Sequence, residues 1–187
     1  NVSVSDDAAP ALVGSKDFTV MLVSTSGNTV LTGTSSGNNT ITYASATAAV
    51  TISLNITTQQ NTLGAGLDTI TAVENLIGSS FADNLTGNST YNSLDGRAGT
   101  DVLRGWSGAD TMIGGPGNDT MYVENTRDAV IEKPNEGSDT VSSSITYTLP
   151  INVEKLILTG ITGINGTGNE LANVITGNGA ANQLNGQ

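Results

Sequence analysis

The sequence contains neither cysteine nor histidine among its 187 residues. Without cysteine, the chain can form no disulfide framework and no thiolate metal site. Without histidine, it lacks the usual zinc ligand and the usual general base of enzymes. Any metal ion that this chain binds must therefore be held by oxygen atoms.

Basic residues and long apolar segments are also scarce. Six Lys and Arg stand against 17 Asp and Glu, which gives a formal net charge of −11. Because acidic surfaces repel phosphate backbones, we expect no nucleic-acid partner. No apolar run approaches the roughly 20 residues that a membrane helix needs, so no membrane span is predicted, and no signal peptide is visible. Low hydrophobicity with high net charge is typical of disordered chains, but bound cations would neutralise the acids and supply folding free energy.

Glycine and aspartate instead recur in a nine-residue pattern. Three consecutive copies occupy residues 96–104, 105–113 and 114–122, each with Gly at positions one and four, Asp at six and a large apolar residue at eight. Glycine allows close backbone approach, so carbonyl oxygens can turn inward. The aspartate adds a charged oxygen, and oxygen ligation suits a hard cation such as Ca²⁺. The apolar residue is predicted to lie in a three-residue strand and to point into a thin core.

Weaker copies flank these three. The frame is recognisable at residues 34–42, 63–71, 78–86, 87–95, 123–131, 168–176 and 177–185. A two-residue slip after 131 brings Gly137, Asp139 and Val141 to positions four, six and eight. Asparagine replaces aspartate at Asn39, Asn92, Asn173 and Asn182. For Asn39, Asn173 and Asn182 we expect uncharged ladders without metal. Further short strands are predicted at 18–23, 29–31, 41–43, 49–54, 145–150 and 153–160 from their apolar and β-branched residues.

The pattern resembles the RTX calcium-binding repeat, Gly-Gly-x-Gly-x-Asp-x-apolar-x. The resemblance covers residues 33–187 and implies an all-β fold, a parallel β-roll or β-helix solenoid with Ca²⁺ between stacked loops. We expect residues 1–32 to be an N-terminal β cap or the end of a preceding domain. Residues 33–131 would form an RTX β-roll with its strongest calcium loops at 96–122. Residues 132–187 would form a second, partly degenerate RTX module that is truncated at its C-terminus.

Two nonapeptides are expected to complete one turn, because nine residues cannot close a coil alone. Loops on the same side are then eighteen residues apart. This spacing pairs Asp101 with Asp119, Asp110 with Asp128, Asp83 with Asp101, and Asn92 with Asp110. A calcium ion between stacked loops can take a carboxylate oxygen from each loop and backbone carbonyls near the glycines. The predicted metal-binding residues are Asp83, Gly96, Ala98, Gly99, Asp101, Gly105, Ser107, Gly108, Asp110, Gly114, Gly115, Gly117, Asp119 and Asp128.

Two features lie outside this frame. Val73-Glu74-Asn75-Leu76 resembles Val153-Glu154-Lys155-Leu156, and we interpret the two glutamates as structural. Trp106 stands where the RTX family usually has glycine, and we expect it to face solvent or to be partly packed.

The resemblance implies a module exported unfolded by type I secretion and folded on Ca²⁺ in the extracellular space or at the cell surface. Such a module is a structural or secretion-associated segment, for example of an adhesin or surface-layer protein. Its expected partners are several calcium ions and other domains of a longer chain, with self-association left open. We expect no catalytic residues and no enzyme activity. The alternative is a β-helix enzyme that modifies polysaccharides, such as a lyase or epimerase. It requires a basic or phenolic group over a groove with clustered acids.

Overall fold

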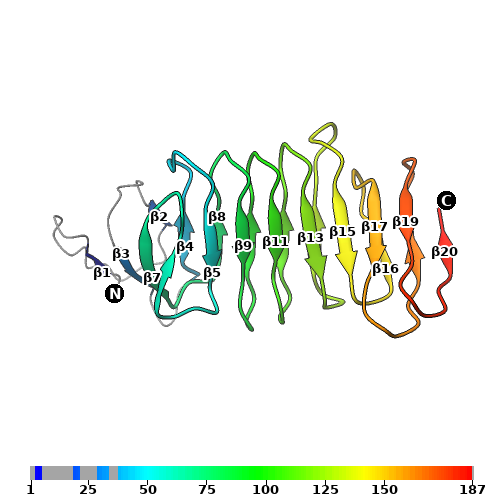
Figure 1. Ribbon diagram of the computed structural model, residues 1–187, viewed down its shortest axis with the longest axis horizontal. Coiled ribbons are helices and arrows are strands. Elements are labelled where there is room, and N and C mark those ends of the chain that lie inside the picture. The colour runs from blue at the N-terminus through cyan, green and yellow to red at the C-terminus, as the bar shows by residue number, and fades with distance from the viewer. Residues whose placement is uncertain (1–2, 6–18, 22–28, 34–37, 187) are drawn as a thin grey trace.

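A computed structural model describes residues 3–5, 19–21, 29–33 and 38–186. The described residues form strands and turns, and no helix occurs among them. Consistent with this, these residues contain no helix of the length and apolarity needed to cross a membrane. Most strands are parallel and stack in turns along the long axis of the molecule (Figure 1). The predicted all-β parallel roll is confirmed.

Two parallel sheets form most of the roll, and the chain alternates between them. The six-stranded sheet contains β2 (Thr19–Met21), β4 (Thr40–Thr42), β8 (Asn75–Ile77), β10 (Ser93–Asp95), β12 (Thr111–Ile113) and β14 (Ala129–Ile131). The seven-stranded sheet contains β5 (Thr51–Ser53), β9 (Asn84–Thr86), β11 (Val102–Arg104), β13 (Thr120–Val123), β15 (Thr140–Ser143), β17 (Lys155–Leu158) and β19 (Val174–Thr176).

Two smaller sheets lie at either end of the described chain. Near its C-terminal end, β16 (Tyr147–Thr148), β18 (Gly166–Thr167) and β20 (Leu184–Asn185) pair in parallel. Near its N-terminal end, β3 (Thr29–Thr32) pairs in parallel with β7 (Leu67–Thr71). In the same sheet, β1 (Ser3–Ser5) and β6 (Gln59–Asn61) pair antiparallel with β3 and β7, respectively.

The register of the central strands confirms the predicted eighteen-residue turn. In the six-stranded sheet, Leu94 aligns with Leu76 on one side and with Met112 on the other. In the seven-stranded sheet, Leu103 aligns in the same way between Leu85 and Met121. The spacing between aligned residues then increases from eighteen to twenty, as the alignment of Met121 with Val141 shows. The two-residue slip in the sequence is therefore accommodated as a longer loop.

The apolar residue at position eight supplies the core. Each central strand has three residues, and its middle residue is buried while both neighbours are half-exposed. Because side chains alternate across a strand, a three-residue strand sends one side chain inward. Burial of each such Leu or Met contributes about 1.5–3 kcal/mol, and the core is thin because each three-residue strand adds one such side chain. The position-eight prediction is confirmed for the central repeats.

The expected repeat at 63–71 differs from the central ones. Its strand β7 starts at Leu67, so Asp68 lies inside a strand and opposite the antiparallel strand β6. Asp68 Oδ2 accepts hydrogen bonds from the Tyr43 hydroxyl (3.2 Å) and the Thr62 hydroxyl (3.0 Å). The predicted strand at 18–23 and the frame at 34–42 lie partly outside the described residues, as does most of the expected cap at 1–32. The domain boundaries remain a prediction.

Candidate metal centre

The loops between the two main sheets stack in two columns, one along each edge of the roll. The first column consists of the loops 78–83, 96–101, 114–119 and 132–139, which lead from the six-stranded to the seven-stranded sheet. The second column consists of the loops 87–92, 105–110 and 124–128, which lead back. Each of these loops ends on the position-six residue, directly before a strand, so the position-six side chains of each column follow one another turn by turn.

A ladder of hydrogen bonds joins the position-six residues of the first column. The backbone N–H of Asp83 donates to Asp101 Oδ1 at 2.7 Å, and that of Asp101 donates to Asp119 Oδ1 at 2.7 Å. The ladder continues from the N–H of Asp119 to Asp139 Oδ1 at 2.9 Å. The predicted neighbours Asp83–Asp101 and Asp101–Asp119 are therefore confirmed as stacked, and Asp139 extends the series.

The second column has the same arrangement. The backbone N–H of Asn92 donates to Asp110 Oδ1 at 2.8 Å, and that of Asp110 donates to Asp128 Oδ1 at 3.1 Å. The last bond is longer, and Asp128 is only half-buried. Both predicted pairs are brought together, with the Asp110–Asp128 pair the looser of the two.

Among the buried oxygens without a hydrogen-bond partner, which also include Asp68 Oδ1, Asn75 Oδ1 and Glu124 Oε2, is one carboxylate oxygen of each position-six aspartate in the three complete repeats. Asp101 Oδ2, Asp110 Oδ2 and Asp119 Oδ2 accept no hydrogen bond from any described residue. Each of these aspartates belongs to one of the three complete repeats. A buried polar atom without a partner costs about 1–3 kcal/mol, and more when it is charged. These oxygens therefore require a proton or a cation.

The glycine at position one leaves room for such a cation. A Cβ atom at Gly96 would lie 2.9 Å from the carbonyl oxygen of Gly114, one turn later, and would also collide with Asp101 Oδ2. The missing side chain thus lets a carboxylate oxygen and a backbone carbonyl of successive turns face the same space. Carboxylate and carbonyl oxygens are the ligands that Ca²⁺ takes in proteins, so the donor set fits calcium.

The glycine at position four keeps the loops close. A Cβ at Gly117 would overlap the carbonyl oxygen of Gly99, the same position one turn earlier. The other predicted glycines (Gly105, Gly108 and Gly115) line the same loops, and Ala98 and Ser107 occupy position three there. The structure thus gathers every predicted metal residue into the two columns, while metal ligation itself remains a proposal.

Burial shifts the titration of the unpartnered aspartates. Loss of solvent raises the pKa of Asp101 to about 7, although the hydrogen bond from the backbone of Asp83 opposes the shift. The negative charges of Asp119 and Asp83 add to the increase. Burial likewise raises the pKa of Asp110 and of Asp119 to about 6. Because these pKa values lie near neutral pH, a cation that binds these carboxylates there would displace a proton.

Asp83 and Asp128 differ from the three unpartnered aspartates. Asp83 Oδ1 accepts from the backbone of Val50 (2.7 Å) and the hydroxyl of Ser79 (2.8 Å), and its Oδ2 accepts from the backbone of Ser79. Asp128 Oδ2 accepts from the backbones of Glu124 (3.1 Å) and Asn125 (2.9 Å). Their oxygens are already hydrogen-bonded, so these two predicted ligands have less need of a cation.

The side-chain amide of asparagine at position six donates a hydrogen bond to a backbone carbonyl of the preceding turn. The Nδ2 atom of Asn92 donates to the carbonyl of Glu74 at 2.9 Å, and that of Asn173 donates to the carbonyl of Val153 at 2.9 Å. Asn182 Nδ2 donates to the carbonyl of Ile164 at 2.6 Å. A positively polarised N–H₂ group thus links these turns. The expectation that the loops of Asn173 and Asn182 bind no metal remains a prediction.

Further acids lie in or next to the columns. Glu74 and Glu154 stand directly before strands, at position six, and their Oε2 atoms accept the backbone N–H of Asn39 (2.7 Å) and Asp139 (2.8 Å). This bonding agrees with their interpretation as structural. Asp139 and Glu132 were not predicted as ligands either. The recurring Val-Glu-x-Leu phrase and the position of Asp139 in the slipped frame were the available signals.

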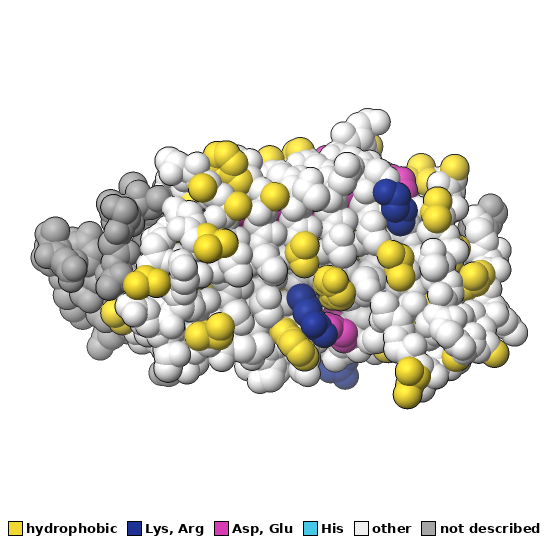
Figure 2. All heavy atoms as spheres, viewed as in Figure 1, with side chains coloured by type: hydrophobic (Ala, Val, Ile, Leu, Met, Phe, Trp, Pro, Cys, Tyr) yellow, Lys and Arg dark blue, Asp and Glu magenta, His cyan; other side chains and the backbone are white. Residues whose placement is uncertain are grey.

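The basic and aromatic residues that an enzyme site would use lie on the sheet surface. Arg104 forms an ion pair with Glu124, and its guanidinium lies 3.9 Å from the centre of the Trp106 ring. Trp106 is 43% exposed, as expected. A hollow of about 420 Å³ next to Arg104 and Tyr122 is lined without any acidic residue. Figure 2 shows few acidic side chains on one face of the molecule. The clustered acids that a polysaccharide lyase needs are therefore not at this hollow.

Comparison with known families identifies the repeats. The model for the RTX calcium-binding nonapeptide repeat matches the chain in four copies, over residues 77–112, 86–121 and 104–128. No curated protein matches the chain. The matched region contains the three complete repeats and the five predicted aspartates of both columns. The glycine-lined loops, the stacked aspartates and the parallel turns agree with this match, and residues 77–128 of the chain thus carry RTX calcium-binding nonapeptide repeats that are wound into a β-roll.

Proposed function

We propose that this chain is a calcium-dependent module that folds on Ca²⁺ outside the cell and acts as a structural or secretion-associated segment of a larger protein. The observation that carries the proposal is the set of three buried, unpartnered carboxylate oxygens, one in each complete repeat. Buried oxygens that are left without partners in a repeating position are best explained as ligands. Calcium, when bound, supplies positive charge between successive turns.

The residues of the first column would hold the ion between turns. Asp101 Oδ2 and the Gly114 carbonyl face the same space and belong to consecutive loops. The ladder bond from the backbone of Asp83 fixes the orientation of the Asp101 carboxylate at 2.7 Å. An ion held in this way joins two loops that are eighteen residues apart, so each ion stabilises the stacking of neighbouring turns.

The charge and the affinity range of such sites support folding outside the cell. With a net charge of −11, the chain repels itself when calcium is scarce. Extracellular calcium modules work at about 10⁻⁴–10⁻³ M, a concentration reached outside cells. The RTX family is typically found in secreted bacterial proteins and is typically structural rather than catalytic. Export by type I secretion and a role within an adhesin or a surface-layer protein are the finer parts of this proposal.

Calorimetric titration with calcium tests the proposal. Asp101→Ala removes the charged ligand of one loop, and we expect the stoichiometry to fall by at least one ion and the remaining affinity to weaken roughly tenfold, because neighbouring turns are coupled. The control is Asn173→Ala, which removes an amide that donates to the Val153 carbonyl and should keep the parent stoichiometry. Equal stoichiometry and affinity in the parent and in Asp101→Ala would show that the aspartate column is not the calcium site.

A further inference from the structure

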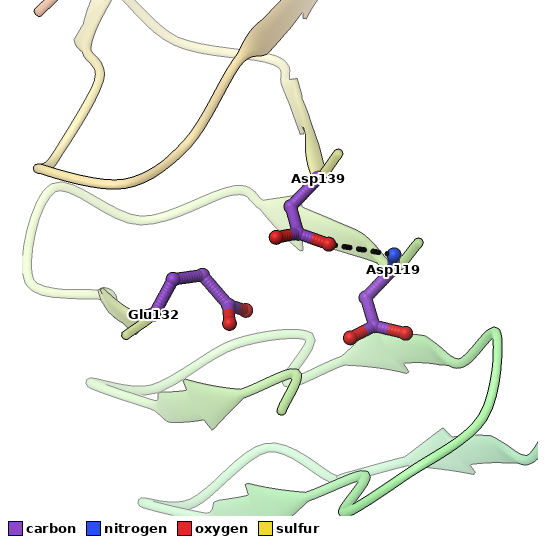
Figure 3. Close-up of side chains that lie close together, drawn as sticks. All are labelled: Asp119, Glu132 and Asp139. Carbon is purple, nitrogen blue, oxygen red and sulfur yellow. Dashed lines mark hydrogen bonds between the residues drawn. The ribbon is translucent and has the colours of Figure 1, made fainter. Parts of the chain in front are cut away.

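Three buried carboxylates meet at the end of the first column, one of them within the residues that the family model matches and two beyond them. One oxygen each of Asp119, Glu132 and Asp139 lies within 4.8 Å of the other two (Figure 3). These residues are 1%, 5% and 1% exposed, respectively. The repeat match ends at residue 128, so it includes neither Glu132 nor Asp139. The cluster joins the loop 114–119 to the loop 132–139, where the turn lengthens to twenty residues.

Glu132 places a carboxylate where earlier turns place a backbone carbonyl. The space beside Gly96 is faced by the carbonyl oxygen of Gly114, eighteen residues later. The corresponding space beside Gly114 is faced instead by Oε1 of Glu132, also eighteen residues later. The Glu132 carboxylate is held there by the backbone N–H groups of Gly114 (3.0 Å) and Gly115 (3.3 Å). The place that a neutral carbonyl oxygen occupies in the earlier turn is thus occupied by a carboxylate here.

Asp119 provides an independent indication of a ligand at this point. Its Oδ2 atom is buried and accepts no hydrogen bond within the described chain. A Cβ on Gly114 would lie 2.5 Å from this atom and also against Glu132 Oε1, so both oxygens point into the same space. Figure 3 shows the Glu132 carboxylate directed toward Asp119 and Asp139. The unpartnered oxygen therefore faces two further carboxylates and no hydrogen-bond donor.

No basic residue neutralises this cluster through an ion pair in the described part of the chain. Lys133 lies next to Glu132 in sequence but pairs with Glu136 at 3.6 Å. Asp139 is fixed by the backbone N–H of Asp119 at 2.9 Å, which leaves its other oxygen directed toward Glu132 (Figure 3). Three carboxylates without a paired base form a site for a multivalent cation.

We propose that Asp119, Glu132 and Asp139 form the tightest calcium site of this chain. The inference rests on the proposed calcium-dependent function and adds two residues beyond the matched repeats, Glu132 and Asp139, to the position-six aspartate of the last complete repeat. Ligand charge sets calcium affinity, and Ca–O distances of about 2.3–2.6 Å place opposite ligands roughly 5 Å apart. One oxygen of each carboxylate lies within 4.8 Å of the other two, so a single calcium ion can reach all three.

A calcium titration of the Glu132→Gln variant tests the site. In the parent chain we expect one ion to bind at least about tenfold more tightly than the others, because ligand charge count tunes affinity. In Glu132→Gln this tight phase should disappear, while the other ions still bind and the far-UV spectrum at saturating calcium is unchanged. Glu170→Gln removes the same charge from an exposed residue and should behave as the parent does.

Each outcome separates the two proposals. A parent chain that binds calcium, together with a Glu132→Gln variant that keeps the tight phase, overturns the three-carboxylate site alone. A parent chain that binds no calcium overturns the proposed function and this site with it. If Glu132→Gln does not fold, Glu132→Gly decides, because earlier turns fold with glycine at position one. That variant must lose the tight phase, and retention of the phase overturns the proposal.

Discussion

At the scale of single residues, aspartate and asparagine at position six interact differently with the neighbouring turn. Asn92 and Asn173 link neighbouring turns by donating their amide hydrogens to carbonyls. Asp101, Asp110 and Asp119 have nothing to donate, and one oxygen of each stays unpartnered. An asparagine at position six thus adds a side-chain hydrogen bond to a neighbouring turn, whereas the aspartates of the complete repeats leave one oxygen available to a proton or a cation.

The raised pKa values of these acids predict an unusual response to pH. The pKa is about 7 for Asp101, about 6 for Asp110 and Asp119, and about 8 for Glu132, mainly because burial disfavours the charged form. In the unfolded chain the values are about 4. The folded state therefore binds more protons between about pH 4 and pH 8, and its stability must fall as the pH rises through this window. In chelator, we expect more β structure at pH 5 than at pH 8 by far-UV circular dichroism.

Calcium should reverse this trend. Because the ion binds carboxylates only when they are deprotonated, its affinity falls as the pH drops below about 7. A titration at limiting calcium should thus show a higher midpoint at pH 5.5 than at pH 7.5, on the order of several-fold.

A chelated chain that loses β structure on acidification would contradict the assignment of the raised pKa values to the folded roll.

At the scale of the elements, each strand and loop depends on the next turn. A strand such as β11 buries one side chain, Leu103, and its loop reaches the next turn through a few hydrogen bonds, among them the Asp101 ladder bond and the bond from the Gly99 N–H to the Pro116 carbonyl. No such unit buries enough surface to fold alone, so stability comes from nearest neighbours. Close stacking of the loops is the condition for this coupling.

Replacement of the position-four glycine tests how closely the loops must stack. A methyl group at Gly117 would overlap the Gly99 carbonyl, so we expect Gly117→Ala to lower the free energy of unfolding by about 2–3 kcal/mol. The calcium midpoint should rise as well. Gly179→Ala is the matched control, because nothing lies within 4 Å of a Cβ at that position. Urea unfolding in saturating calcium measures both variants, and equal midpoints would mean that the loops tolerate separation.

The sequence predicted the elements best where the frame is complete. Position eight identified the buried residues Leu94, Leu103 and Met112, and the eighteen-residue step identified their neighbours. At 63–71 position eight still identified the buried Ile70, but Asp68 at position six lies inside β7, opposite the antiparallel strand β6, and not at the end of a loop. A nine-residue pattern does not encode the antiparallel pairing of β7 with the preceding strand β6.

The candidate site was predicted in part for a similar reason. The aspartates of the complete repeats lie where the frame placed them, with Asp101 N–H bonded to Asp119. Glu132 was missed because it occupies a glycine position and reaches back one turn with a long side chain. Its role depends on the loop of the preceding turn that it contacts. The two-residue insertion before Asp139 concealed this contact in the sequence.

At the scale of the whole molecule, stability depends on the balance between repulsion among the acidic residues and burial of the apolar core. The core is a thin layer of apolar side chains between the two sheets, and two ion pairs join described residues, Arg104–Glu124 and Lys133–Glu136. Most of the 17 acids therefore have no basic partner. A thin core and uncompensated acids leave little net stability unless a ligand binds the folded state. Calcium is the ligand that the columns fit, so folding and calcium binding should be one process.

Far-UV circular dichroism at neutral pH, first in chelator and then in millimolar calcium, tests this central claim most directly. We expect a largely unfolded spectrum in chelator and a β spectrum after calcium is added, because the ion supplies the missing folding free energy. Magnesium at the same concentration should restore little structure, since it resists dehydration and demands octahedral geometry. A fully β spectrum in chelator that calcium leaves unchanged would contradict the claim.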